Sequence, residues 1–202
     1  RAFHYRIDTM MQLCNHFDAH VIAFDYRGFG DNEGAPTEDG TRLDARACSK
    51  WLDNALKGNE NVMKILYGHS LGSSIGAFLL ADKNFGAKYD GFIMNGAFSC
   101  GDDAMSVMKM SSFLRIIPPL FNYVLRNWRI ITKGYNTLEA IKDIDTQLEV
   151  VMIHGTNDIT VPYTLGQKLY AAWQYERSLI QKKNGIIKKS ASITFVTLEG
   201  GL

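Results

Sequence analysis

Ser70 stands between two glycines, in the pentapeptide Gly-His-Ser-Leu-Gly that runs from Gly68 to Gly72. An apolar run precedes this pentapeptide and a run of small residues follows it. A glycine–x–serine–x–glycine sequence between a strand and a helix is typical of a nucleophile elbow, a tight turn that exposes the serine hydroxyl. The pattern therefore predicts that Ser70 is a nucleophile for acyl transfer. The alternative is a glycine-lined turn with an incidental serine.

The neighbours of Ser70 have the residue types that such a turn requires. We expect Gly68 and Gly72 to avoid clashes where the strand and the helix approach each other. Three further small residues follow in the predicted helix and would let it pack closely on the strand: Ser73, Ser74 and Gly76. The backbone N–H of Leu71, at the helix start, would face an oxyanion that develops on the substrate. Adjacent side chains at an elbow point apart, so His69 is expected to pack or hydrogen-bond rather than act as the base.

A serine nucleophile needs a base, and the base needs an acid that orients it. Behind such an elbow the chain order is serine, acid, histidine, and catalytic groups gather at the carboxyl ends of parallel strands. Asp158 is the preferred acid because it follows the strand predicted at 148–153. Asp102 and Asp103, which follow the strand predicted at 90–95, are the alternative. Asp158 could also be a turn residue without a catalytic role.

The base has no candidate in the expected place. The five histidines all precede Asp158: His4, His16, His20, His69 and His154. We therefore expect the triad histidine just after Leu202. A second oxyanion donor is likewise expected from a loop before Arg1, and we interpret both ends of the chain as cuts.

The elements that must position these residues alternate along the chain. Apolar periodicity predicts helices at 5–17, 40–57, 71–82 and 163–177. Short apolar runs predict strands at 20–25, 61–67, 90–95, 148–153 and 192–198. This alternation favours an α/β fold with a mostly parallel sheet and helices on both faces. The length suits one domain, which we predict over 1–202 as a partial domain.

One segment interrupts the alternation. The connection between the strands predicted at 90–95 and 148–153 is longer than a crossover needs. We predict an insertion over 99–145, with an apolar stretch at 110–128 that would cap a pocket. A pair of helices packed into the core is the alternative.

Composition excludes several classes of function. The net charge is only +1, so the basic footprint of a nucleic-acid-binding protein is missing. Three widely spaced cysteines, Cys14, Cys48 and Cys100, do not form a disulfide framework. No run of residues has the length and hydropathy of a membrane span or a signal peptide. No cluster suggests a metal site, and the predicted chemistry requires no cofactor.

Three segments together resemble the lipid-hydrolysing α/β-hydrolase-domain (ABHD) family: 24–40, 67–76 and 153–170. The resemblance covers most of the chain and is weakest between 100 and 140. It implies an α/β-hydrolase fold, Ser70 as the nucleophile and Asp158 as the triad acid. It also implies a lipid ester substrate, a monoacylglycerol or a lysophospholipid. The family's histidine loop begins where this chain reads Glu-Gly-Gly-Leu, and its histidine has no counterpart here.

The same resemblance implies an endoplasmic-reticulum membrane protein whose membrane span would lie upstream of Arg1. It implies a structural role for Asp25 and Arg27 in the loop before the second helix. Four lysines before the last strand would face either an anionic lipid surface or solvent: Lys182, Lys183, Lys188 and Lys189. An acyl-protein thioesterase or depalmitoylase, and a lipid-binding protein without catalysis, are the alternatives to a lipase.

Overall fold

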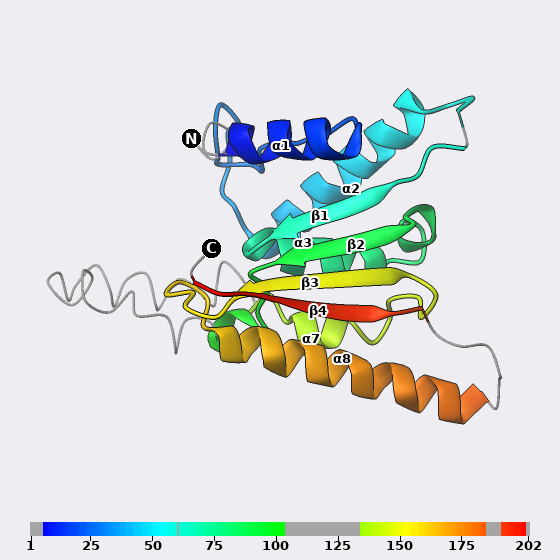
Figure 1. Ribbon diagram of the computed structural model, residues 1–202. Helices are drawn as coiled ribbons and strands as arrows, with labels where there is room; N and C mark the ends of the chain where they lie inside the picture. Colours follow the sequence, from blue (N-terminus) through cyan, green and yellow to red (C-terminus); the bar gives the residue numbers. More distant parts are fainter. Residues whose placement is uncertain (1–5, 60, 104–133, 185–190, 201–202) are drawn as a thin grey trace, which may run out of the picture. The chain divides into compact units, whose positions relative to one another are not determined.

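The computed structural model describes residues 6–59, 61–103, 134–184 and 191–200 of the chain (Figure 1). These residues belong to two compact units, Arg1–Ala55 and Leu56–Leu202.

The first unit contains two helices joined by a long loop. Helix α1 spans Ile7–Phe17, which confirms the predicted helix over its described part, and it ends where Asp18 adopts a left-handed conformation at φ 47°. Helix α2 spans Glu38–Ala55 and begins two residues before its predicted start. The reason is a cap, because the hydroxyl of Thr37 accepts a hydrogen bond from the Gly40 amide at 3.1 Å.

The strand predicted at 20–25 is wrong. Residues 19–26 adopt no strand in the structure, and Ile22 and Phe24 are 47% and 39% exposed. An apolar run becomes a strand only where a neighbouring strand completes its hydrogen bonds, and none pairs with it in the described ranges. The apolar stripe of α2 is also largely unburied, since Leu43 and Trp51 are 53% and 57% exposed.

The second unit is built on a parallel sheet. Its strands are β1 (Ile65–His69), β2 (Gly91–Asn95), β3 (Glu149–Gly155) and β4 (Ile193–Leu198), and they lie in the order β1-β2-β3-β4. Every neighbouring pair is parallel. The predicted α/β fold with a parallel sheet is therefore confirmed. The strand predicted at 61–67 is shifted toward the elbow, and the other three lie within two residues of their predicted bounds.

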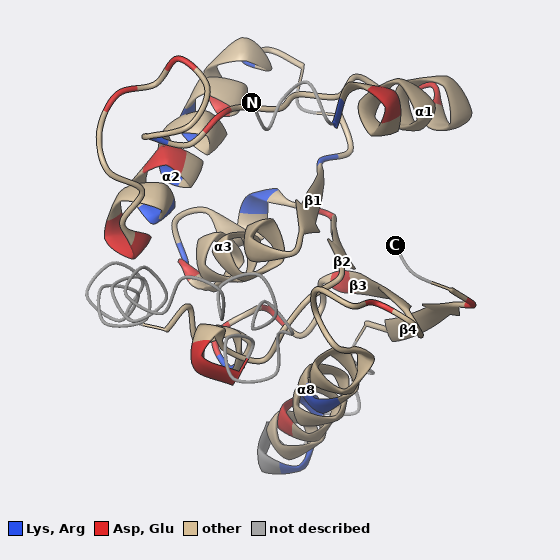
Figure 2. Ribbon diagram, turned by 90° about the vertical axis from the view of Figure 1, so that its left-hand side faces the viewer, with Lys and Arg blue, Asp and Glu red and all other residues tan. Residues whose placement is uncertain are grey.

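One face of this sheet carries the helices of the second unit. Among the described residues these include α3 (Leu71–Ala81), the short α7 (Thr137–Ala140) and α8 (Tyr163–Asn184), with a 3₁₀ turn η2 at Gly86–Lys88. Figure 2 shows α3 and α8 on the same side of the sheet. Alternate strand residues pack with these helices in one core cluster, which includes Phe92, Met94, Val150, Met152, Ala77, Leu80, Ile141, Leu169 and Trp173. This cluster fixes α3 and α8 against the strands that precede the two predicted catalytic residues.

The predicted insertion is described only at its ends. Residues 104–133, with the apolar stretch 110–128, lie outside the described residues, as do Lys188 and Lys189. After the gap, α7 follows and Ile141 and Ile144 are buried in the core. Ser74 ties this segment to α3, because its hydroxyl lies 2.9 Å from the Tyr135 carbonyl oxygen.

Candidate active site

Ser70 occupies the turn between β1 and α3 in an unusual backbone conformation. Its φ is 50° and its ψ is −116°, which residues other than glycine rarely adopt. The turn is held from β2, since the Ser70 amide donates to the carbonyl oxygen of Asn95 at 2.8 Å. Strain of this kind persists only where the surroundings impose it, and it gathers at functional sites. The structure thus places Ser70 on a tight strand–turn–helix connection, as the pattern predicts.

Gly68 allows β1 and α3 to meet at this turn. A Cβ atom at position 68 would lie 2.6 Å from the Cα of Ser73 and 2.7 Å from the carbonyl oxygen of Gly72. Farther along α3, a Cβ at Gly76 would lie 3.0 Å from the ring of Phe92. Small residues at these two positions therefore bring the helix onto the strands.

The clash predicted for Gly72 is wrong. No heavy atom in the described part of the chain outside its own helix turn lies within 4 Å of the position that a Cβ would take there. The backbone of Gly72 makes the close approach to Gly68, whereas its own missing side chain would face open space.

The start of α3 offers one oxyanion donor. Leu71 is the first residue of the helix, and a first-turn amide has no acceptor within its own helix. Because it directly follows Ser70, this N–H lies beside the serine, where the positive end of the helix dipole favours negative charge.

Asp158 lies in the turn after β3 with its carboxylate firmly oriented. Its Oδ1 accepts hydrogen bonds from the amides of Thr160 at 2.7 Å and Val161 at 2.9 Å. Its side chain is 10% exposed. The Nε2 of His154 lies 3.8 Å from Oδ2, beyond hydrogen-bond range, and Oδ2 forms no hydrogen bond within the described residues. The carboxylate thus forms an Asx-type turn with one oxygen and keeps the other for a further donor.

The turn that carries Asp158 is fastened to the end of β4. The Thr156 amide donates to the Leu198 carbonyl at 2.9 Å, and the Asn157 amide donates to the Gly200 carbonyl at 3.0 Å. The Gly200 amide in turn donates to the Thr156 hydroxyl at 3.3 Å. The acid turn and the outgoing end of β4 therefore form one hydrogen-bonded unit.

Ser70 and Asp158 lie at the same edge of the sheet. Both follow the carboxyl ends of parallel strands, and only β2 separates β1 from β3. Two strand spacings amount to about 10 Å. An imidazole with a hydrogen bond on each side spans a gap of this order.

The alternative acids are placed less favourably. The Asp103 carboxylate pairs with Lys168 of α8 and accepts the Ser99 hydroxyl at 2.7 Å. The hydrogen bond from Lys168, followed by that from Ser99, lowers the pKa of Asp103 below its usual value. Asp102 is exposed. The Asp103 carboxylate is thus already engaged by a lysine of α8.

One residue beside the elbow belongs to no motif in the sequence. Asn95 ends β2, and besides holding Ser70 through its carbonyl it donates its side-chain amide to the Tyr67 hydroxyl at 2.9 Å. The Oδ1 of Asn95 is buried without a hydrogen-bond partner among the residues described. Its place as the last residue of the strand predicted at 90–95 is the only hint that the sequence could have offered.

His154 is not available as the base. It is 1% exposed, and its Nε2 lies 2.9 Å from the carbonyl oxygen of Val161. This burial agrees with its exclusion on chain order.

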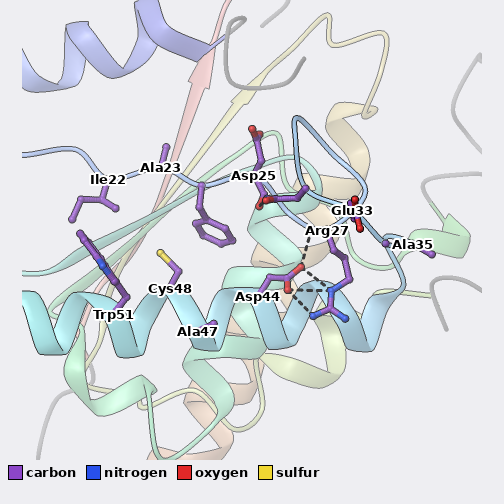
Figure 3. A pocket seen from close by; sticks show the side chains of 13 residues that line it. Ile22, Ala23, Asp25, Arg27, Glu33, Ala35, Asp44, Ala47, Cys48 and Trp51 are labelled. Atoms are coloured by element: carbon purple, nitrogen blue, oxygen red, sulfur yellow. Dashed lines mark hydrogen bonds and ion pairs between the residues drawn. The ribbon is translucent and has the colours of Figure 1, made fainter.

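The first unit contains a separate cavity of about 730 Å³ between the loop and α2. In Figure 3 an apolar end with Ile22 and Trp51 lies opposite a polar end where Arg27 reaches Asp44. The Nη2 of Arg27 lies 2.7 Å from the Oδ1 of Asp44, and the Arg27 amide donates to Oδ2 at 3.0 Å. Arg27 thus ties the loop to α2, which is a structural role.

The described residues contain neither a metal-ligand cluster nor a membrane-spanning helix. No group of three or more His, Cys, Asp or Glu side chains there could hold a metal ion. None of the helices in the described ranges combines the length and hydropathy that crossing a bilayer requires.

Comparison with known proteins matches these observations. The model of the alpha/beta hydrolase fold family matches residues 3–133. The lysophosphatidylserine lipase ABHD12 of Danio rerio is 29% identical over 87% of this chain and 45% of its own length. The human protein ABHD12B is 32% identical over 84% of this chain and 46% of its own length. The chain thus spans just under half the length of these relatives.

Solved structures show the same fold. An esterase of Pyrococcus furiosus superposes with a TM-score of 0.66 at 18% identity, covering 96% of this chain and 66% of its own. An alpha-beta hydrolase of Vibrio vulnificus gives a TM-score of 0.60 at 17% identity, covering 88% of this chain and 55% of its own. With its strained serine elbow, its parallel sheet and its family-model match over more than half of its residues, the chain belongs to the α/β-hydrolase family.

Proposed function

We propose that the protein is a serine hydrolase that cleaves carboxylic esters of lipids through an acyl-enzyme on Ser70. The observation that carries this proposal is the backbone of Ser70, at φ 50° and ψ −116° between β1 and the start of α3. A turn this strained, held by Asn95 at the carboxyl edge of the sheet, has a mechanistic use when the serine hydroxyl must project from it.

The mechanism follows from these positions. The Ser70 oxygen attacks the ester carbonyl carbon, and its proton passes to a histidine base that Asp158 orients. The amide of Leu71 stabilises the oxyanion of the tetrahedral intermediate. The intermediate collapses, the alcohol leaves with the proton from the histidine, and the acyl group stays on Ser70. Water then attacks the acyl-enzyme, with the same base, and releases the fatty acid.

The base is the group still to be located. No histidine lies between Asp158 and Leu202, and the order serine, acid, histidine places the base after β4. Reading the transcript past the codon for Leu202 tests this directly. A histidine within roughly ten codons supports the triad, and its absence favours a lipid-binding protein without catalysis.

The proposed substrate class is a lysophospholipid or monoacylglycerol. It is supported by the relative named lysophosphatidylserine lipase, which aligns with 87% of this chain at 29% identity. The same elbow chemistry serves acyl-protein thioesters, so the choice of leaving group needs a direct assay. For the whole protein we propose residence at the endoplasmic-reticulum membrane, which fractionation of tagged full-length protein tests.

A reactive-serine probe and a substrate panel test the proposed activity. The full-length protein and its Ser70→Ala variant would be treated with a fluorophosphonate and assayed on lysophosphatidylserine, a monoacylglycerol and a palmitoylated peptide. Ser178→Ala is the matched control, because this hydroxyl only donates to the Tyr175 carbonyl on α8. We expect labelling and lipid hydrolysis that disappear in Ser70→Ala and survive in Ser178→Ala. Faster cleavage of the peptide thioester would indicate a depalmitoylase, and unlabelled wild-type protein would contradict the hydrolase proposal.

A further inference from the structure

His154 is a buried titratable side chain that the proposed mechanism does not use. It lies next to the end of β3, and its side chain is 1% exposed. Gly166 of α8 closes over it so tightly that a Cβ at position 166 would overlap the imidazole Nδ1. The ring of Tyr163 meets it edge-on, with 5.8 Å between ring centroids. Packing therefore holds the imidazole in one orientation.

Hydrogen bonding fits only one form of this ring. A carbonyl oxygen can only accept, so Nε2, which lies 2.9 Å from the Val161 carbonyl oxygen, carries a proton and donates it. Nδ1 is buried and has no partner in the part of the chain that the structure describes. A proton there would be removed from water without an acceptor, which is costly. The arrangement matches a neutral imidazole with its proton on Nε2.

Hydrogen bonds from His154 and to Asp158 hold the two backbone groups of Val161. Its carbonyl oxygen accepts from His154, and its amide donates to Asp158 Oδ1 at 2.9 Å. The Nε2 of His154 also faces the other carboxylate oxygen, Oδ2, at 3.8 Å. Because its only proton goes to Val161, the ring approaches Oδ2 without occupying it.

We propose that His154 is a positioning residue for the acid of the triad. By anchoring the Val161 carbonyl it fixes the turn 158–161, and by donating elsewhere it leaves Asp158 Oδ2 for the catalytic base. This inference rests on the proposed function, in which Asp158 is the acid. Gly166 belongs to the same device, because its missing side chain makes room for the ring.

Kinetics of four variants of the full-length protein test the role, with a short-chain 4-nitrophenyl ester as the probe. His154→Leu removes the donor, and His154→Gln keeps an N–H that can reach the Val161 carbonyl. Gly166→Ala keeps the histidine in the sequence but adds a methyl group that overlaps its ring. Leu169→Ala is the control, since Leu169 is fully buried in the core on the same helix and takes no part in the hydrogen bonds of His154, Asp158 and Val161.

We expect His154→Leu and Gly166→Ala to lower kcat roughly tenfold to a hundredfold with KM unchanged, because a small misplacement of a catalytic group costs rate rather than binding. His154→Gln should recover most of kcat. Leu169→Ala should lower the melting temperature and leave kcat of the folded protein unchanged. Equal kcat in wild type and His154→Leu, or no difference between the Leu and Gln variants, would overturn the inference.

A spectroscopic measurement on the wild-type protein keeps the test independent of activity and of variant folding. Nitrogen-15 shifts of labelled histidine should show the His154 proton on Nε2 rather than on Nδ1. A proton on Nδ1 would contradict the inference while leaving the hydrolase proposal intact. Full activity in Asp158→Asn would instead remove the acid from the proposed function. The two failures are therefore distinguishable.

Discussion

The Ser73 hydroxyl donates to the carbonyl oxygen of Gly68 at 2.8 Å, across the turn that carries Ser70. This hydrogen bond joins the end of β1 to the first turn of α3, and Ser73 is fully buried where it forms. The elbow is thus fastened on both sides of Ser70, by Ser73 within the turn and by Asn95 from the next strand.

The two elbow glycines should respond differently to an added methyl group. Gly68→Ala forces a Cβ into the backbone of Ser73, so we expect a loss of about 2 kcal/mol or more in the free energy of unfolding. Gly72→Ala has open space and a helical position, and it should be neutral or stabilising by up to about 1 kcal/mol. Urea unfolding followed by circular dichroism measures both. Equal losses at the two positions would show that the close approach at Gly68 does not decide stability.

Asp158→Asn should separate catalysis from folding. The Asn side-chain oxygen can still accept from the Thr160 and Val161 amides, so the turn and the melting temperature should be kept. A neutral amide cannot hold the base in its working tautomer, and kcat should fall by roughly 10³–10⁴. The comparison variant is Asp103→Asn, in which the carboxylate that pairs with Lys168 becomes an amide. A loss of kcat in Asp103→Asn alone would move the acid to the alternative site.

The Arg27–Asp44 ion pair should make the stability of the first unit depend on pH. Hydrogen bonding from Arg27 lowers the pKa of Asp44 below its ordinary value of 3.8. A carboxyl whose pKa is lower in the folded state stabilises fully above its unfolded pKa, and that stabilisation is lost as the pH falls through the folded pKa. Asp44→Asn should therefore increase hydrogen exchange in residues 24–50 at pH 7.

The same substitution should have little effect once the pH lies below the folded pKa of Asp44. Each variant is compared with wild type at the same pH, because exchange itself depends on pH. Glu33→Gln is the control, since Glu33 lines the same cavity and is exposed. An Asp44→Asn effect that persists undiminished in acid would show that packing, rather than the ion pair, holds the loop.

Arg177 should be a major stabilising residue of the second unit. Its guanidinium donates to the carbonyls of Leu148 at 2.7 Å and Ala191 at 2.5 Å, and it lies over the ring of Trp173. Burial lowers the pKa of this arginine. Because Arg177 is only 5% exposed, water cannot freely replace the lost donors. Arg177→Met keeps the apolar stem but leaves two carbonyls unpaired, and we expect a loss of about 3 kcal/mol.

Chemical unfolding measures this loss, and Lys142→Met is the comparison. Lys142 makes an exposed pair with Glu139, which should contribute less than about 1 kcal/mol. A similar small effect for Arg177→Met would mean that solvent reaches the carbonyls of Leu148 and Ala191.

The sequence was sufficient for elements whose signals are local. The strands at 91–95 and 149–155 are apolar runs that end at a turn, and α3 follows a glycine-flanked serine, so periodicity and turn residues locate them. The segment 20–25 has the same apolar character but no partner strand in the described ranges, and no local pattern reports whether a partner is present.

The candidate site shows the same difference between local sequence signals and contacts that join distant parts of the chain. Ser70 and Asp158 could be predicted because each stands in a short motif after a strand. The roles of Asn95 and His154 depend on contacts between β2 and the elbow, and between β3 and α8. Such contacts join residues far apart in the chain, so they become visible only when the strands are placed side by side.

The hydrogen bonds between residues 156–157 and 198–200 also affect the local concentration of any group that follows them in the chain. They hold the chain leaving β4 against the turn of Asp158, and so they act as a tether. We expect that a group carried on the chain a few residues after Gly200 would meet Asp158 at an effective concentration of about millimolar or more, set by a short loop rather than by diffusion. Loosening the tether by Thr156→Val would dilute such a group without altering Ser70 or Asp158.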